Sequence, residues 1–292
     1  MTYGITGASG QLGTSALRHL LTRVPAAEVV AVTRTPGKLQ EFADRGVRVR
    51  AGDFKDAATL TGALEGVDRL LLIPMPDLAP GVRPPLHRAG IEAARKAGVG
   101  HVIYVSSVGA RPNSSDDILN THFETEQALI GSGLPWTFLR MGPYADFLID
   151  PMKAAVTNGA HASRGSAPAS PVVRDDLGAA AAGLLASDGH AGITYQATAP
   201  VSLTAAEIAA AVGAAFGKTI EHTALSGEQV RANLAAAGLP APMAEVLARF
   251  QDASASGLFD VVTHDVERLS GRPAQSPVDF IVAVLKAQGA QA

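Results

Sequence analysis

The 292-residue sequence contains no cysteine. This absence excludes a disulfide framework, a thiolate metal site and a cysteine nucleophile. An excess of charge of one sign is also missing, because the formal net charge is −3 and the lysines and arginines form no run. A nearly neutral, slightly acidic chain is not typical of proteins that bind nucleic acid or membrane surfaces, so we expect neither as a partner.

Long apolar runs are absent too. No stretch is long enough to span a bilayer, and the N-terminus has no basic segment followed by an apolar one. We therefore expect a cytoplasmic protein. The eight histidines do not cluster at ligand spacing, so we expect no metal site, and the nucleophile-elbow pattern of serine hydrolases is missing.

The first half of the sequence alternates between strand-like and helix-like segments. Short apolar segments typical of buried strands occupy residues 3–6, 28–33, 47–50, 69–73, 101–105 and 136–140. Helical patterns separate them. This order predicts an α/β fold with a Rossmann-type, doubly wound parallel sheet that is covered by helices on both faces.

The alternation weakens after about residue 142. Residues 159–171, rich in small residues and proline, are predicted to form a long loop. Helices are predicted at residues 174–186, 204–216, 226–237, 242–251 and from 276 on, and Thr204 and Ser226 each begin a capping-box pattern. We therefore predict a Rossmann domain over residues 1–150 and a smaller, mostly helical C-terminal lobe over 151–292, elements of which can return to the first domain.

A glycine-rich turn lies between the first predicted strand and the first predicted helix. Glycines at positions 7, 10 and 13 let the backbone approach a pyrophosphate, and the helix N-terminus offers free N–H groups. This position at the start of a βαβ series favours a dinucleotide-binding loop over a plain tight turn. The residues expected to bind the cofactor here are Gly7, Ser9, Gly10, Gln11, Leu12 and Gly13.

The end of the second predicted strand indicates which dinucleotide binds. NAD-binding domains place an acidic residue there, whereas this sequence reads Ala-Val-Thr-Arg and has Lys38 four residues after Arg34. A guanidinium can bind a 2′-phosphate in a bidentate manner, so we expect NADP(H); a solvated arginine is the alternative. Asp53 and Phe54 follow the third strand, where they would meet the adenine, although Asp53 could equally form an ordinary helix-capping turn.

Five motifs together are informative: Ile-Thr-Gly-Ala-Ser-Gly-Gln-Leu-Gly at 5–13, Ala-Val-Thr-Arg at 31–34, Tyr-Val-Ser-Ser at 104–107, His-Phe-Glu-Thr-Glu at 122–126 and Leu-Arg-Met-Gly-Pro-Tyr at 139–144. They resemble those of the NmrA-like atypical short-chain dehydrogenases, and most of all their NADPH:quinone oxidoreductase type 2 branch. The resemblance implies an NADPH-binding Rossmann domain, a small substrate-binding C-terminal lobe and a substrate cleft between them.

The helix that carries a Tyr/Lys pair in ordinary short-chain dehydrogenases has His122 and Glu126 at that spacing. These residues cannot supply the same phenol-based proton transfer. The absence favours hydride transfer to a quinone or a similar conjugated small-molecule acceptor over reduction of a plain ketone. The alternative is a redox-silent sensor that binds NADP(H) without turnover. We expect a monomer or a homodimer.

Two residues are candidate proton donors. The resemblance places the turn formed by Gly142, Pro143 and Tyr144 near the nicotinamide, so the Tyr144 hydroxyl could orient or protonate the substrate; a cleft-lining tyrosine is the alternative. His122 could relay a proton near neutral pH, or could be an exposed helix histidine paired with Glu126.

Two further segments are expected beside the cofactor. Ser106 ends the fifth predicted strand, where short-chain dehydrogenases carry a serine that binds substrate or ribose; a serine that caps a loop is the alternative. Ile73 and Pro74 end the fourth predicted strand, where Met75 and Pro76 continue a rigid, apolar wall.

Overall fold

The computed structural model describes residues 1–113 and 117–289. The chain forms two compact units. The first unit comprises Met1–Arg140, Arg174–Gln196 and Asp265–Arg272, and the second comprises Met141–Val173, Ala197–His264 and the chain from Pro273 on. Two segments that follow residue 150 therefore return to the first unit.

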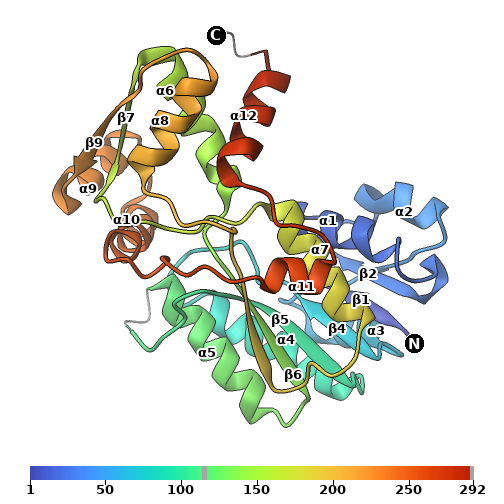
Figure 1. The fold of residues 1–292 in the computed structure, drawn as a ribbon. Helices are drawn as coiled ribbons and strands as arrows, with labels where there is room; N and C mark the ends of the chain where they lie inside the picture. The colour runs from blue at the N-terminus through green and yellow to red at the C-terminus, as the bar shows by residue number, and fades with distance from the viewer. Residues whose placement is uncertain (114–116, 290–292) are drawn as a thin grey trace. The chain divides into compact units, whose positions relative to one another are not determined.

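The first unit is built on a seven-stranded sheet with the order β3-β2-β1-β4-β5-β6-β8 (Figure 1). Neighbouring strands from β3 to β5 are parallel, and Tyr3 of β1 lies opposite Val29 of β2 and Arg69 of β4. The sheet confirms the predicted doubly wound Rossmann-type fold. The strands are β1 (Tyr3–Ile5), β2 (Val29–Thr33), β3 (Arg48–Ala51), β4 (Arg69–Leu72), β5 (His101–Ser107), β6 (Trp136–Met141) and β8 (Ile193–Ala197).

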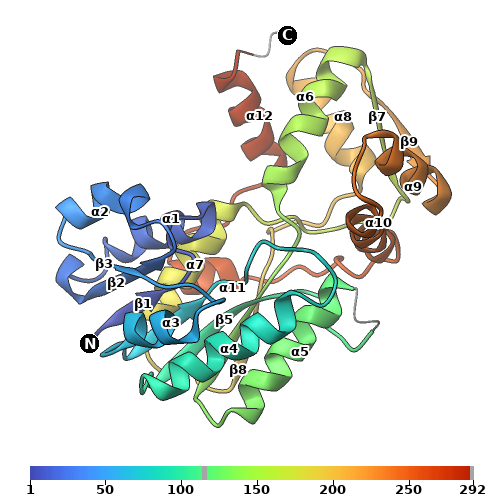
Figure 2. The same cartoon turned by 180° about the vertical axis from the view of Figure 1, so that it is seen from behind.

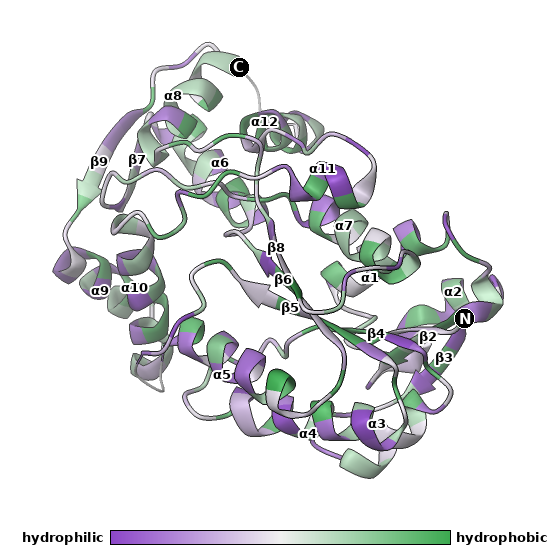
Figure 3. Ribbon diagram, turned by 60° about the horizontal axis from the view of Figure 1, so that its bottom comes forward, coloured by the Kyte–Doolittle hydropathy of each residue, from purple (hydrophilic) through white to green (hydrophobic). Residues whose placement is uncertain are grey.

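Helices cover both faces of this sheet. One face carries α1 (Gln11–Leu20), α7 (Arg174–Ala186) and α11 (Asp265–Ser270), and the other carries α3 (Ala57–Leu64), α4 (Arg83–Lys96) and α5 (Ile118–Gly131) (Figures 1 and 2). The short α2 (Gln40–Asp44) and the 3₁₀ turns η1 (Ala26–Glu28) and η2 (Pro36–Leu39) complete the unit. Hydrophobic and hydrophilic residues are mixed along α4 and α5 (Figure 3), as expected for helices that bury one face.

Close packing of α7 holds α1 in place. Helix α7 is rich in Ala and Gly, and a Cβ on Gly178 would lie 2.8 Å from the Cβ of Ser15 in α1. Real Cβ atoms essentially never approach a neighbour that closely, so only glycine permits this contact. This contact helps to fix α1, whose N-terminus follows the carboxyl end of the interior strand β1.

The second unit is mostly helical. Its helices are η3 (Ala145–Leu148), α6 (Ile149–Asn158), α8 (Ala205–Ala215), α9 (Gly227–Ala236), α10 (Ala241–Ala255) and α12 (Pro277–Ala287). Thr204 and Ser226 form the predicted capping boxes of α8 and α9. Apolar residues of α6, α8 and α12, among them Met152, Val212 and Leu285, form the core of this unit.

The long loop predicted over 159–171 is wrong in part. Strand β7 (Ala160–Arg164) pairs in parallel with β9 (Glu221–Leu225), with His161 opposite His222. The strand depends on a partner about sixty residues away, which local composition does not reveal. Among the described residues, no helix is long and apolar enough to cross a membrane.

Candidate functional site

A hollow of about 350 Å³ lies at the carboxyl ends of four parallel strands of the first unit. It lies at the point where the strand order reverses. From β1 the chain adds β2 and β3 on one side, and then adds β4 and β5 on the other side of β1. Such switch points are where open α/β sheets bind ligands. The lining residues include Thr6, Gly7, Ser9–Gly13, Val32–Arg34, Gly52–Phe54, Leu60, Ile73–Pro76 and Arg174.

The loop between β1 and α1 has the geometry of an anion cradle. Gly7 has φ +61°, a left-handed conformation that favours glycine, and Gly10 N donates to Gly7 O at 2.9 Å. Gly10 is the N-cap of α1 and makes no side-chain cap, and the first turn contains no acidic residue. The N–H groups and positive dipole end of α1 are thus left to an anionic ligand.

The same loop leaves little or no room for a side chain at Gly10 and Gly13. A Cβ on Gly13 would lie 2.7 Å from Ala8 Cα and would overlap Gly7 O, and a Cβ on Gly10 would lie 3.2 Å from Gly7 O. On the neighbouring strand end, a Cβ on Gly52 would lie 2.7 Å from the Val32 side chain. The absence of side chains at these glycines fits a pyrophosphate pressed against main-chain N–H groups.

Polar side chains connect the loop to the end of β2. Ser9 Oγ and Thr33 Oγ1 lie 2.6 Å apart, and Thr33 Oγ1 accepts a hydrogen bond from Thr35 N at 3.2 Å. Arg34 is exposed and lines the hollow, whereas Lys38 is exposed on η2 and is not among the lining residues. The residues at the strand end therefore suit a 2′-phosphate better than a bare ribose diol.

Sequence reasoning missed Arg174 as a site residue. It is the first residue of α7, lines the hollow, and donates to Gln11 Oε1 at the first turn of α1. The hollow thus contains a second guanidinium beside Arg34. The 163 positions that separate Arg174 from Gln11 hide this proximity in the sequence.

The remaining walls follow β3 and β4. Ile73 N donates to Thr6 Oγ1 at 3.0 Å, which ties the Ile73–Pro76 wall to β1. Phe54 lines the opposite wall. Asp53 also lines the hollow, and its Oδ1 accepts a hydrogen bond from Lys55 N at 3.0 Å, but the residue that caps α3 is Asp56.

His122 lies inside the protein rather than on its surface. It is 1% exposed, and its Nδ1 is 3.0 Å from Tyr104 OH. Burial, assisted by the positive charge of Arg83, lowers the pKa of His122 well below its ordinary value of 6.5. This position argues against the proton relay that we predicted, because a buried ring that stays neutral cannot exchange protons with substrate near neutral pH.

The alternative interpretation of His122, an exposed residue paired with Glu126, is wrong. Glu126 is 2% exposed and forms a bidentate pair with Arg140, at 2.8 Å to Nε and 2.6 Å to Nη2. Its Oε1 also accepts from Ser106 Oγ at 2.6 Å. Ser106 is therefore held at the end of β5 by Glu126 and is not among the residues that line the hollow.

Gly142 and Tyr144 belong to the second unit. Gly142 N donates to Ala197 O at 2.9 Å, and Tyr144 forms an isolated parallel bridge with Val172. The Tyr144 ring packs edge-on against Phe147, with ring centroids 5.7 Å apart. The roles of Gly142 and Tyr144 at the nicotinamide stay predictions.

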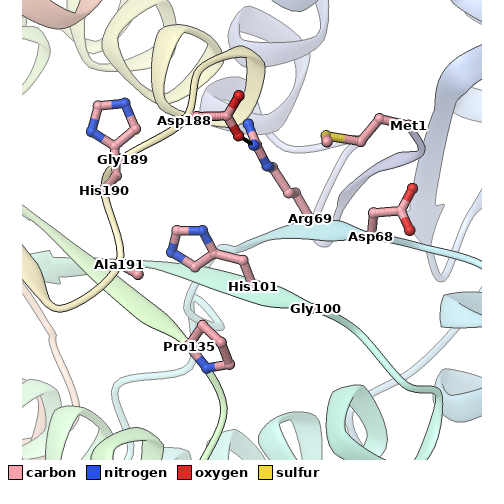
Figure 4. Close-up of a pocket in the computed structure, with 10 residues that line it drawn as sticks. All are labelled: Met1, Asp68, Arg69, Gly100, His101, Pro135, Asp188, Gly189, His190 and Ala191. Atoms are coloured by element: carbon pink, nitrogen blue, oxygen red, sulfur yellow. Dashed lines mark hydrogen bonds and ion pairs between the residues drawn. The ribbon is translucent and has the colours of Figure 1, made fainter.

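A larger hollow, of about 750 Å³, lies at the opposite end of the strands, where β4 and β5 begin (Figure 4). Polar side chains that line it already bond to other groups of the protein. Arg69 donates to the Leu185 and Ser187 carbonyls and pairs with Asp188, and His101 Nε2 lies 2.9 Å from Thr137 Oγ1. We therefore assign the smaller hollow as the site, since the uncapped N-terminus of α1 lies there.

Within residues 1–113 and 117–289, no cluster of three or more His, Asp or Glu side chains could hold a metal ion. The cradle, the two guanidinium groups and the glycine contacts together fit a dinucleotide with an additional phosphate.

Comparisons with known proteins agree with this assignment. Residues 7–188 match a family model described as NAD(P)H-binding. The chain is 37% identical to quinone oxidoreductase 2 of Escherichia coli (strain K12) over 279 residues, covering 95% of this chain and 96% of that protein. It is 30% identical to an NAD(P)H azoreductase of Xenophilus azovorans over 290 residues, covering 98% of this chain and 99% of that protein.

Solved structures show the same relationship. The structure of the NADPH-dependent quinone oxidoreductase of Escherichia coli complexed with NADPH superposes with a TM-score of 0.91 at 33% identity, covering 97% of this chain and 100% of that chain. The triphenylmethane reductase of Citrobacter sp. gives a TM-score of 0.90 at 32% identity, covering 98% and 100%. The chain therefore belongs to the NAD(P)H-binding family and is an NAD(P)H-dependent oxidoreductase.

Proposed function

We propose that the protein reduces a quinone or a similar conjugated acceptor with NADPH, without the Tyr/Lys pair of ordinary short-chain dehydrogenases. NADPH, when bound, supplies a hydride, and reduction of a quinone to a hydroquinone consumes one further proton. Relatives named for quinone, azo-dye and triphenylmethane-dye reduction support this substrate class, because all of these acceptors are conjugated.

The observation that carries the proposal is the composition and packing of α5. This helix contains neither tyrosine nor lysine, and its residues at the usual catalytic spacing, His122 and Glu126, are buried in other interactions. A plain ketone needs a strong proton donor as its alkoxide forms. A quinone delocalises the developing anion, so water or a modest donor such as the Tyr144 hydroxyl suffices.

A panel of acceptors tests this proposal. Purified protein is mixed with NADPH and, in separate reactions, a benzoquinone, a naphthoquinone, an azo dye, a triphenylmethane dye and an unconjugated ketone, and loss of nicotinamide absorbance is recorded. We expect turnover of at least one conjugated acceptor and none of the ketone. NADPH binding without any turnover would instead support the redox-silent sensor, and ketone reduction at a comparable rate would refute the reasoning from α5.

NADP(H) is the cofactor form that we propose for the site, with Arg34 and Arg174 facing its phosphates. Three observations support it: the end of β2 has no carboxylate, Arg34 lines the hollow, and the related quinone oxidoreductase was solved with NADPH. A monomer or homodimer located in the cytoplasm stays our prediction from the sequence.

A further inference from the structure

A chain of hydrogen bonds connects the wall of the dinucleotide hollow to α5. Met75, a lining residue, donates from its backbone N to His87 Nε2 at 3.3 Å. His87 Nδ1 lies 2.9 Å from Thr125 Oγ1, and Thr125 Oγ1 donates to Thr121 O at 2.8 Å. All of these groups lie in the first unit.

The chemistry of these groups settles the tautomer of His87. A backbone N–H can only donate, so Nε2 must be the unprotonated acceptor. Because the Thr125 hydroxyl gives its own proton to Thr121 O, it accepts from His87 Nδ1–H. Nδ1 of the ring therefore donates and Nε2 accepts, and a second ring proton, on Nε2, would break the hydrogen bond from Met75 N.

Burial keeps the ring in this form. His87 is 1% exposed, and burial together with the nearby Arg83 guanidinium lowers its pKa to about 3. The ring stays neutral across the physiological range, so the acceptor for Met75 N persists.

The same face of α4 supports a second wall. The Phe54 ring packs edge-on against His87, with centroids 6.4 Å apart, and a Cβ on Gly90 would lie 2.9 Å from Phe54 Cδ1. On its other side His87 contacts Tyr104 at a centroid distance of 6.0 Å. One histidine thus contacts both Phe54 and Met75, the residues that line the hollow after β3 and after β4.

We infer that His87 is a positioning residue of the dinucleotide site, which holds the Ile73–Pro76 and Phe54 walls at the spacing that NADPH requires. It touches neither substrate nor the reacting atoms. The inference rests on the assignment of the hollow to NADPH in the proposed function, and it is independent of which acceptor is reduced.

Direct titration of NADPH binding, followed by nicotinamide fluorescence, tests this role. His87→Leu removes both hydrogen bonds and leaves Met75 N unsatisfied, so we expect the Kd for NADPH to rise about tenfold. His87→Gln offers an acceptor and a donor at similar positions, and we expect a Kd within about threefold of the wild type. The matched control, His101→Leu, loses a histidine–threonine hydrogen bond at the amino end of β5, away from the hollow, and should leave the Kd for NADPH unchanged.

Circular dichroism and thermal unfolding confirm that each variant is folded before titration. A purely structural role would lower thermal stability in His87→Leu and in His101→Leu alike, and would leave the NADPH affinity of the folded protein unchanged. Unchanged affinity in folded His87→Leu overturns the inference, as does a His87→Gln variant that binds as weakly as His87→Leu. A wild-type protein that does not bind NADPH would instead refute the cofactor assignment itself.

A spectroscopic signature gives an independent readout. In protein with ¹⁵N-labelled histidine, we expect the His87 ring to show one unprotonated nitrogen from about pH 8 down to about pH 5, where an ordinary histidine becomes protonated. The signal is assigned by its loss in His87→Gln. Titration of this ring near its usual pKa would overturn the inference, because a protonated Nε2 cannot accept from Met75 N.

Discussion

Replacing Gly13 by alanine tests whether the loop before α1 is a phosphate cradle. The added Cβ would lie 2.7 Å from Ala8 Cα, whereas ordinary contacts of Cβ atoms are 3.4–4 Å. The difference requires a displacement of roughly 0.7 Å between the loop and the helix. Helix α1 cannot yield easily toward α7, because Gly178 packs so closely against it that a Cβ there would lie 2.8 Å from Ser15 Cβ.

The displacement therefore falls on the loop of residues 7–10, whose backbone would approach the pyrophosphate. A shift of at least roughly 0.7 Å would weaken the charge-assisted hydrogen bonds from main-chain N–H groups to the pyrophosphate, each worth about 1.5–3 kcal/mol, so the Kd for NADPH should rise by about tenfold or more. Overpacking should also lower the free energy of unfolding by about 1–3 kcal/mol. Fluorescence titration and urea unfolding measure the two effects separately.

Gly62→Ala in α3 is the matched control. No heavy atom lies within 4 Å of its added Cβ, so NADPH affinity should not change, and the helix should gain up to about 1 kcal/mol in stability. A folded Gly13→Ala protein that binds NADPH as tightly as the wild type would refute the cradle.

Three further substitutions or conditions have expected outcomes. Arg34→Ala should lower the affinity for NADPH about tenfold and leave the affinity for NADH almost unchanged in parallel titrations, because only NADPH has a 2′-phosphate. Equal losses of affinity for both dinucleotides would place that phosphate elsewhere. Glu126→Ala should lower the free energy of unfolding in urea by about 3 kcal/mol, since it leaves the largely buried Arg140 without its partner; a loss under about 1 kcal/mol would show that the pair contributes little. His87 and His122 stay neutral in the folded protein, where the charged or titratable groups near them are Arg83, Arg140 and Tyr104. Both titrate near pH 6.5 in the unfolded chain, which therefore takes up their protons as the pH falls below 6.5. Below pH 6.5 the free energy of unfolding should then fall by about 1.4 kcal/mol per pH unit for each histidine, and for His87 this fall should continue to about pH 3. In His87→Gln, the slope of the unfolding free energy against pH between about pH 6.5 and 5 should be smaller by the contribution of one proton. An unchanged slope would contradict this expectation.

Features that depend on neighbours in sequence were predictable. The alternation of strands and helices follows from hydrophobic periodicity, and the capping boxes at Thr204 and Ser226 follow from residues three positions apart. The glycine-rich loop and the missing carboxylate at the end of β2 are also contiguous patterns. They sufficed to predict the Rossmann-type sheet and an NADP(H) cofactor, because a βα turn and its helix N-terminus form from adjacent residues.

Features that depend on packing between distant segments were decided only by the tertiary structure. Arg174 reaches Gln11 because α7 lies against α1, and β7 exists because β9 pairs with it. Helical spacing placed His122 and Glu126 on one face of α5, but it could not tell whether that face points to solvent or to the sheet. The structure turns it inward against Tyr104 and Arg140, because burial is a property of what packs on a helix and not of the helix alone.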